Sequence, residues 1–491
     1  MPLRLYNTRT RTVEPFQTRT PDHARIYVCG LTPSAEAHLG HARSFLFFDV
    51  LRRYLEHPHN AYRVTYVQNV TDVDDHSIAI AQREHTTVED VVERHYGSFK
   101  DSMRRLGMRE FDVEPWATQY IPQIVEMIGE LIERGFAYVV EDGVYYAVTR
   151  FPRYGQLSGK HIDELLVGAR IAENEHKLDP LDFALWKFAK AGEPAWPSPW
   201  GAGRPGWHIE CSAMSRTILG VPFDLHGGGY DLIFPHHENE VAQSEALMDA
   251  PPMADFWVHT GLLNFDGRKM SKSLGNFEPL AALLERHDPL AIRLLFLQTG
   301  YRKPMNFTED SIAGATRMLR RMQRGVLRLR EQSSDAAAGD AAGADAFAAI
   351  FAALDDDMDT ARAIGLLFGI LRERVEPALA PAVLARALDV LAVLGLGPAF
   401  APEALRAIDA EDDAPVVDPA IVQRLAARVG DVVHLNGAAP EAAIQAVIDA
   451  RAAARRDKDF ALGDRLRDAL AAEGIVLKDS KDGTTWTLAG A

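Results

Sequence analysis

One short segment of the chain combines the donor types that bind metals in proteins. Residues 234–240 read Phe-Pro-His-His-Glu-Asn-Glu, and a helix that begins after the proline places His236 and Glu240 four residues apart on one face. Their imidazole and carboxylate could then bind the same ion, whereas His237 would point elsewhere, toward a nucleotide or the surroundings of the ligands. Loops rich in histidine are often merely polar, so the spacing alone leaves a metal site and a polar loop equally open.

The chain has two cysteines, Cys29 and Cys211, which can join this segment or pair with each other. Residues 206–211 read Gly-Trp-His-Ile-Glu-Cys, so a further histidine and carboxylate stand beside the second thiol. Two thiolates with an imidazole and a carboxylate form a reasonable zinc-binding set. A structural disulfide is unlikely in a reducing cytosol, and two unrelated buried thiols are the remaining alternative.

A second cluster is His38-Leu39-Gly40-His41, which follows the first cysteine at the expected start of a helix. Helix N-termini present unpaired N–H groups and a partial positive charge, so they favour phosphate. Two imidazoles there could donate hydrogen bonds to ATP as its α-phosphate becomes five-coordinate. The four-residue pattern is weak by itself, because surface histidines produce it by chance.

The third cluster is residues 269–273 (Lys-Met-Ser-Lys-Ser), followed by Leu-Gly-Asn at 274–276. Lys269 and Lys272 in such a loop suit a clamp over a triphosphate, where positive charge offsets the charge of the transition state. A solvated lysine loop is the alternative. Both clusters in one chain, in this order, are far more specific than either alone, and together they resemble the two signatures of class I aminoacyl-tRNA synthetases.

The elements that would position these clusters follow from the hydrophobic pattern. Residues 25–29 predict a buried strand that ends at Gly30, a periodic helix is expected from about 41 to 55, and residues 62–68 alternate as a second strand. Strand, glycine turn, helix and strand open a parallel α/β sheet with a right-handed crossover. Ligands of such sheets bind beyond the carboxyl ends of the strands, where the histidine cluster would lie.

The rest of the chain predicts an α/β fold: a Rossmann-like parallel-sheet catalytic domain with an inserted connective domain, then a helical bundle and a small C-terminal domain. Residues 116–199 mix helix and strand patterns and look like the insertion. Helical pattern dominates from about 312, with an Ala/Gly/Asp/Ser loop at 333–345 and a loose stretch at about 397–419.

The composition limits the classes of protein to which the chain can belong. The 491 residues are enough for three or more domains, and 47% hydrophobic with 25% charged residues is usual for a soluble globular protein. The N-terminus lacks the apolar run of a signal peptide, and no stretch reaches the roughly 18 apolar residues of a spanning helix, so a cytoplasmic location is expected. The net charge of -16 has the wrong sign for indiscriminate nucleic-acid binding, although a local basic patch could still bind RNA.

Longer segments resemble one family, the cysteinyl-tRNA synthetases. The similar segments are residues 203–214, 224–229, 231–240, 179–187 in the insertion, and the terminal 458–461 and 483–486. The likeness covers nearly the whole chain. It implies a monomeric enzyme that activates L-cysteine with ATP, taken with Mg²⁺, and transfers it to the 3′ end of tRNA(Cys). The domains expected from it are 1–115 and 200–250 (the two halves of the catalytic domain), 116–199 (connective insertion), 251–311 (stem-contact region), 312–400 (tRNA-binding helical bundle) and 415–491 (anticodon-binding domain).

The resemblance also implies roles for individual residues. In that family the positions matching Cys29, Cys211, His236 and Glu240 bind one zinc ion, and the thiolate of the substrate completes the coordination. A thiol on zinc loses its proton, whereas a hydroxyl is a poor zinc ligand, so serine would be rejected without an editing domain. No insertion of that size is evident.

The remaining roles concern the substrates. The resemblance places Thr71, Trp207 and Asp231 in the cysteine pocket, and core packing for the tryptophan or a turn or helix cap for the aspartate are the alternatives. The residues implied for ATP binding or catalysis are His38, Gly40, His41, Lys269 and Lys272. A basic patch that could recognise the anticodon, or else form a solvated helical face, comprises Arg451, Arg455, Arg456, Lys458, Arg465 and Arg467.

Several positions differ from the usual residues of the family, namely Leu31, Pro33, Ser34, His76, Trp116 and Thr260. Some point to a relative, the ligase of mycothiol synthesis that joins cysteine to a glucosaminyl-inositol sugar, because it shares a Thr-Pro after the first cysteine and resembles residues 258–261. The complete segment 236–240 and the long terminal extension favour the synthetase. A nucleotide-binding paralogue that charges no tRNA is the third alternative.

Overall fold

The computed structural model describes residues 2–160, 176–249, 252–265, 268–269, 278–334, 344–412, 420–435, 439–480 and 483–488. The chain forms two compact units, Met1–Ala401 and Pro402–Ala491. Within the described ranges, no helix is both long enough and apolar enough to cross a membrane.

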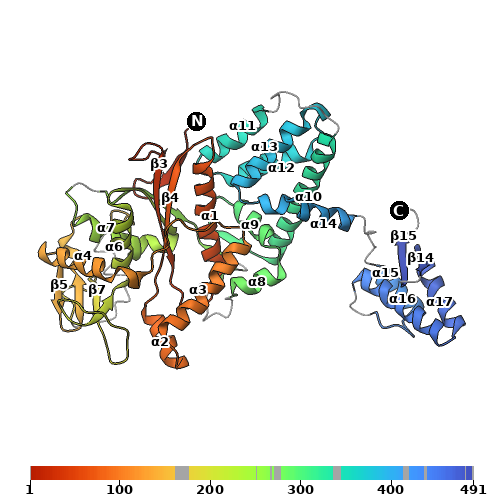
Figure 1. The fold of residues 1–491 in the computed structure, drawn as a ribbon, viewed down its shortest axis with the longest axis horizontal. Coiled ribbons are helices and arrows are strands. Elements are labelled where there is room, and N and C mark those ends of the chain that lie inside the picture. The colour runs from red at the N-terminus through yellow and green to blue at the C-terminus, as the bar shows by residue number, and fades with distance from the viewer. Residues whose placement is uncertain are drawn as a thin grey trace. The chain divides into compact units, whose positions relative to one another are not determined.

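A four-stranded parallel sheet lies at the centre of the first unit. β3 (His23–Leu31) pairs with β4 (Arg63–Val70) on one side and with β9 (Phe223–Gly229) on the other, and β9 pairs with β10 (Ala254–Thr260). The sheet order is therefore β10-β9-β3-β4. Its strands are largely buried, as in parallel sheets that are covered on both faces. α1 (Leu39–Glu56) crosses from β3 to β4 and packs alongside them (Figure 1).

A second, antiparallel sheet is inserted between β4 and β9, in the order β5-β6-β7-β8. The elements of this region are α2 (Asp75–Glu84), α3 (Val88–Arg105), η1 (Ala117–Tyr120), α4 (Ile121–Glu133), β5 (Ala137–Val140), β6 (Gly143–Tyr146), η2 (Val148–Arg150), β7 (Phe183–Phe188) and β8 (Gly203–Pro205). α6 (Trp207–Leu219) then returns the chain to the central sheet. It ends at Gly220, whose φ of 71° lies in the left-handed region that glycine adopts without strain.

Short elements complete the sheet domain at its edges. They are the hairpin β1 (Arg4–Asn7) and β2 (Thr12–Pro15), η3 (Tyr230–Leu232), the π-helical turn η4 (Ile233–His237), α7 (Glu238–Glu245), β11 (Leu263–Phe265), β12 (Arg268–Lys269), α8 (Leu280–Arg286), α9 (Pro289–Leu297) and β13 (Met305–Phe307). β11 pairs with β12 and with β13.

Helices make up the rest of the first unit and most of the second. In the first unit they are α10 (Glu309–Ser334), α11 (Ala344–Asp355), α12 (Thr360–Arg372), η6 (Pro377–Leu379), α13 (Ala380–Val393) and η7 (Gly397–Phe400). The second unit holds α14 (Pro402–Asp412), α15 (Ile421–Val429), α16 (Pro440–Arg456), α17 (Phe460–Ala472) and the antiparallel hairpin β14 (Ile475–Ser480) and β15 (Gly483–Leu488). A separate apolar core, which includes Leu425, Ile444 and Leu470, holds α15, α16 and α17 together.

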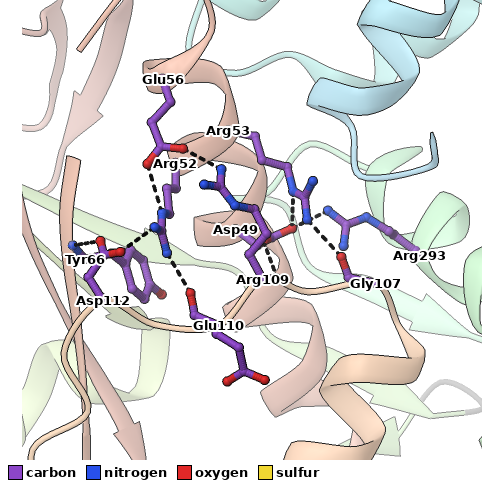
Figure 2. A network of polar contacts seen from close by, with 10 residues as sticks. All are labelled: Asp49, Arg52, Arg53, Glu56, Tyr66, Gly107, Arg109, Glu110, Asp112 and Arg293. Atoms are coloured by element: carbon purple, nitrogen blue, oxygen red, sulfur yellow. Dashed lines mark hydrogen bonds and ion pairs between the residues drawn. The ribbon is translucent and has the colours of Figure 1, made fainter. Parts of the chain in front are cut away.

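A buried polar network ties α1 to the elements around it (Figure 2). Nη2 of Arg293, on α9, donates to Oδ2 of Asp49 at 2.5 Å, and Nε of Arg53 donates to the same oxygen at 2.9 Å. Arg293 is fully buried and also donates to the backbone carbonyl oxygens of Leu106 and Leu394. One guanidinium therefore joins α1, the end of α3, α9 and the turn after α13.

The predicted fold class is confirmed by this architecture. The strands predicted at 25–29 and 62–68 lie within or overlap β3 and β4, and the helix predicted at 41–55 lies within α1. The loop predicted at 333–345 falls largely outside the described residues, and the domain boundaries stay predictions.

Candidate active site and metal centre

Four buried side chains, each from a different element, converge near the carboxyl end of β3. Cys29 ends the buried part of that strand, Cys211 comes from α6, and His236 and Glu240 come from η4 and α7. Sγ of Cys29 lies 3.7 Å from Sγ of Cys211 and 3.3 Å from Oε1 of Glu240, while Nε2 of His236 lies 3.1 Å from the same carboxylate oxygen. One ligand atom from each lies within 4.8 Å of all the others, a spacing that a single metal ion could bridge. Both thiols are free, and their proximity excludes the idea of two unrelated cysteines.

The charges of this cluster suit a cation. Burial opposes ionisation of Cys211, but the hydrogen bond from Cys29 and the charge of His236 lower its pKa to about 6. Burial disfavours a protonated His236, yet Cys211 and Glu240 raise its pKa to about 10. Against the effect of burial, His226 and His236 lower the pKa of Glu240 to about 2. A thiolate and a carboxylate are thus ready for a metal, whose binding would release the proton of His236.

His237 lies against one side chain of this cluster, which is one of the two places that the sequence left open for it, namely the surroundings of the ligands. Its Nε2 lies 3.3 Å from Sγ of Cys29, and Cys29, His226, His237 and Glu240 form a second group whose ligand atoms also lie within 4.8 Å of one another. The segment that ends at His237 is kinked at Phe234, whose backbone is extended, so it is not a regular helix.

Further histidines orient the side chains of the cluster. Nδ1 of His236 lies 2.9 Å from Nδ1 of His208, and Nε2 of His226 lies 2.9 Å from Oε2 of Glu240. Nδ1 of His237 lies 2.8 Å from Nε2 of His259. Hydrogen bonds of this kind fix the tautomer and the ring orientation of metal-binding side chains.

A cavity of about 630 Å³ opens beside this cluster. The N-terminal turn of α6 forms part of its wall, where Trp207 is 42% exposed and its ring lies tilted against that of His236, with centroids 4.2 Å apart. The tryptophan is therefore no core residue. Glu210 also lines the cavity, and its Oε2 accepts a hydrogen bond from Oγ1 of Thr71 at 3.0 Å. Burial, and then the neighbouring Cys211, raise the pKa of Glu210 well above its usual value.

Asp231 does not share that cavity. It is exposed on η3 and lines a separate cavity of about 440 Å³ together with Tyr230, His259 and Arg302. Trp207 therefore lines the same cavity as Glu210, Thr71 is connected to that wall through its hydrogen bond to Glu210, and Asp231 lines the second cavity.

The predicted phosphate site lies at the N-terminus of α1. His38 is the N-cap, its Nδ1 accepts the N–H of Gly40 at 3.0 Å, and its ring stacks on His41 with centroids 3.8 Å apart. Burial, and then the neighbouring His38, lower the pKa of His41 to about 3, so this imidazole is neutral and can donate one N–H. Lys269 ends β12, and Lys272 lies outside the described residues.

Sequence reasoning named Glu210 only as a potential metal ligand and gave no role to His226 or His259. Each had a weak signal: Glu210 interrupts the apolar side of a helix, and the two histidines alternate with residues that face α1 along β9 and β10. The departures Ser34 and His76 both line the cavity beside Trp207. In the terminal unit, Arg465 is paired with Asp431, so its charge is partly neutralised.

Comparisons with known proteins agree with this arrangement. Residues 15–317 match the family described as tRNA synthetases class I (C) catalytic domain, and residues 439–486 match the cysteinyl-tRNA ligase anticodon binding domain. A cysteine–tRNA ligase of Stutzerimonas stutzeri is 45% identical over all of both chains, and one of Geobacter sulfurreducens is 42% identical over 99% of each.

Solved structures agree on the fold. A methionyl-tRNA synthetase of Mycobacterium tuberculosis matches with a TM-score of 0.56 at 14% identity, over 79% of this chain and 93% of that one. A LeuRS of Agrobacterium radiobacter K84 matches with a TM-score of 0.57 at 11% identity, over 80% and 86% of the two chains.

The parallel sheet, its histidine-capped helix and the catalytic-domain match place the chain among the class I aminoacyl-tRNA synthetases. With relatives more than 40% identical over its full length, it belongs to the family of cysteine–tRNA ligases.

Proposed function

We propose that this chain activates L-cysteine with ATP and transfers it to the 3′ end of tRNA(Cys), as a cytoplasmic monomer with one zinc ion. The observation that carries the proposal is the buried set of Cys29, Cys211, His236 and Glu240 beside the large cavity. Two thiols, an imidazole and a carboxylate form a donor set that zinc accepts in a tetrahedral site. We favour this set over the one with His226 and His237 because it offers two sulfur ligands instead of one.

Zinc bound there would supply the attraction that deprotonates and selects a thiol substrate. The chain's own residues would bind and orient the substrates. Thr71 and Trp207 would contact the amino acid in the cavity beside the metal centre. Asp231 would contact it from the second cavity. His208 and His226 hold His236 and Glu240 in place through hydrogen bonds.

His38, Gly40 and His41 would hold the phosphates of ATP, taken with Mg²⁺, at the N-terminus of α1. Lys269 and Lys272 would offset the charge that builds up on the pyrophosphate. The carboxylate of cysteine then attacks the α-phosphorus and pyrophosphate leaves, which gives cysteinyl-adenylate. The terminal ribose hydroxyl of the tRNA attacks the carbonyl carbon of the adenylate, loses its proton, and AMP leaves.

The test is the transfer of radiolabelled cysteine to purified tRNA, with the glucosaminyl-inositol sugar in a parallel reaction and a zinc-stripped control. We expect labelled tRNA, with the label lost when zinc is removed and restored when zinc returns. Labelled sugar beside unlabelled tRNA would overturn the proposal in favour of the sugar ligase, and cysteine-dependent ATP–pyrophosphate exchange without either product would leave only amino-acid activation.

A further inference from the structure

The carboxylate of Glu210 has one oxygen with no partner. Its side chain is buried on α6, with the residue 1% exposed, and Oε2 accepts the hydrogen bond from Thr71. Oε1 has no hydrogen-bond partner among the described residues and faces no solvent. A buried polar atom left without a partner is costly. Because Glu210 lines the cavity, a ligand bound there could supply the missing donor.

The other carboxylates on the wall of this cavity are already engaged. Oδ1 and Oδ2 of Asp74 accept the N–H groups of Ser77 and His76 at the start of α2. Both oxygens of Asp75 are paired with Lys187 and Arg204. Glu210 is therefore the acidic group of this cavity wall, within the part of the chain that the structure describes, that can accept a new donor.

The position of Glu210 indicates which donor that is. Glu210 precedes Cys211 on α6, and the ring of Trp207, one turn earlier, contacts that of His236. A cysteine whose sulfur is held at the metal centre would thus have its other polar groups beside Glu210. It carries one cationic group, the α-ammonium, and a carboxylate that would be repelled by Glu210 and directed toward the phosphate site.

We propose that Oε1 of Glu210 accepts a hydrogen bond from the α-ammonium group of cysteine, with Thr71 as the positioning residue that holds the carboxylate. This inference rests on the proposed function. It adds a second selection to that made by the metal: the metal centre selects the thiol, and Glu210 selects the free amino group. Thiols without an ammonium group, or with an acylated one, would be excluded.

Two analogues that each lack one group of cysteine can test the selection of the thiol and the selection of the amino group separately. Cysteamine has the thiol and the ammonium group but no carboxylate, and 3-mercaptopropionate has the thiol and the carboxylate but no ammonium group. Their binding to the zinc-loaded full chain would be measured by titration calorimetry without ATP, in the wild type and in Glu210→Gln. We expect the variant to bind cysteamine about 10- to 100-fold more weakly, the range of a charged hydrogen bond, and to bind 3-mercaptopropionate equally well or better.

Controls separate this role from a structural one. Zinc content per chain and thermal unfolding of Glu210→Gln should match those of the wild type. Glu130→Gln, on the surface of α4, should leave both affinities unchanged. Equal weakening of both thiols, or no weakening of cysteamine, would overturn the inference.

A measurement on the wild type covers the case in which the variant does not fold. Cysteamine should bind at least 10-fold more tightly than 2-mercaptoethanol, its neutral analogue, and equal affinities would overturn the inference without any variant. If the wild type charged no tRNA and bound no cysteine, the proposed function itself would fail. Normal charging together with equal affinities would overturn the role of Glu210 alone.

Discussion

The buried pair of Asp49 and Arg293 offers a direct test of how the catalytic sheet is joined to the helices around it (Figure 2). In Asp49→Asn, the guanidinium of Arg293 stays buried without its counter-charge, and Arg53 loses its carboxylate partner as well. Removing one partner of a buried ion pair costs about 3–5 kcal/mol. Arg53 is partly exposed and can turn to water, so we place the loss near the lower end of that range.

The assay is urea unfolding of the full chain, followed by circular dichroism, for Asp49→Asn, Arg293→Met and the double variant. Each single variant should lose about 3 kcal/mol in the free energy of unfolding. The double variant should lose less than the sum of the two, by roughly 1–3 kcal/mol, because both charges of the buried Asp49–Arg293 pair are then absent. Additive losses would show that the two side chains do not stabilise each other, and would refute the reasoning.

Three further predictions concern neighbouring features. The neighbouring arginines outweigh burial and lower the pKa of Asp49. The stabilisation that Asp49 provides is therefore complete above the unfolded pKa of about 3.9 and is lost as the pH falls toward the folded value. The urea midpoints of the wild type and Asp49→Asn should accordingly converge below about pH 4. Gly395→Ala places a Cβ 2.0 Å from a nitrogen of Arg293 at a φ of 68°, and should lower the melting temperature, whereas Gly365→Ala meets nothing within 4 Å and should not. Cys211→Ser should lose zinc by elemental analysis together with cysteine-dependent ATP–pyrophosphate exchange, while a cobalt-loaded wild type should show thiolate charge-transfer absorbance that the variant weakens. Retained zinc and exchange in Cys211→Ser would favour the set with His226.

Much of the central fold could be predicted because its signals are local. The alternation in residues 62–68 and the periodicity in 41–55 each reflect burial of one segment, and both correspond to observed elements. The order of the sheet carries no such signal. β3 lies between β4, its neighbour in sequence, and β9, which follows after a long insertion, and only the packing of the folded chain decides that pairing.

The candidate site could likewise be predicted only in part. Cys29, Cys211, His236 and Glu240 are brought together as the resemblance implied, and His237 contacts Cys29, in one of the two places that the sequence left open for it. The positions of Asp231 and Glu210 depend on which cavity each wall residue faces, and a single sequence does not encode that in any short pattern.

The separation of the two thiols has a consequence for the growing chain on the ribosome. Cys29 and Cys211 are 182 residues apart, and at about 5–20 residues per second the second is made roughly 10–35 s after the first. During that interval β3 has β4 beside it but lacks β9, so one edge of a hydrophobic strand is unpaired and open to association with other chains. Until β9 and α6 are made, this edge of β3 and the thiol of Cys29 lack the partners that cover them in the folded chain.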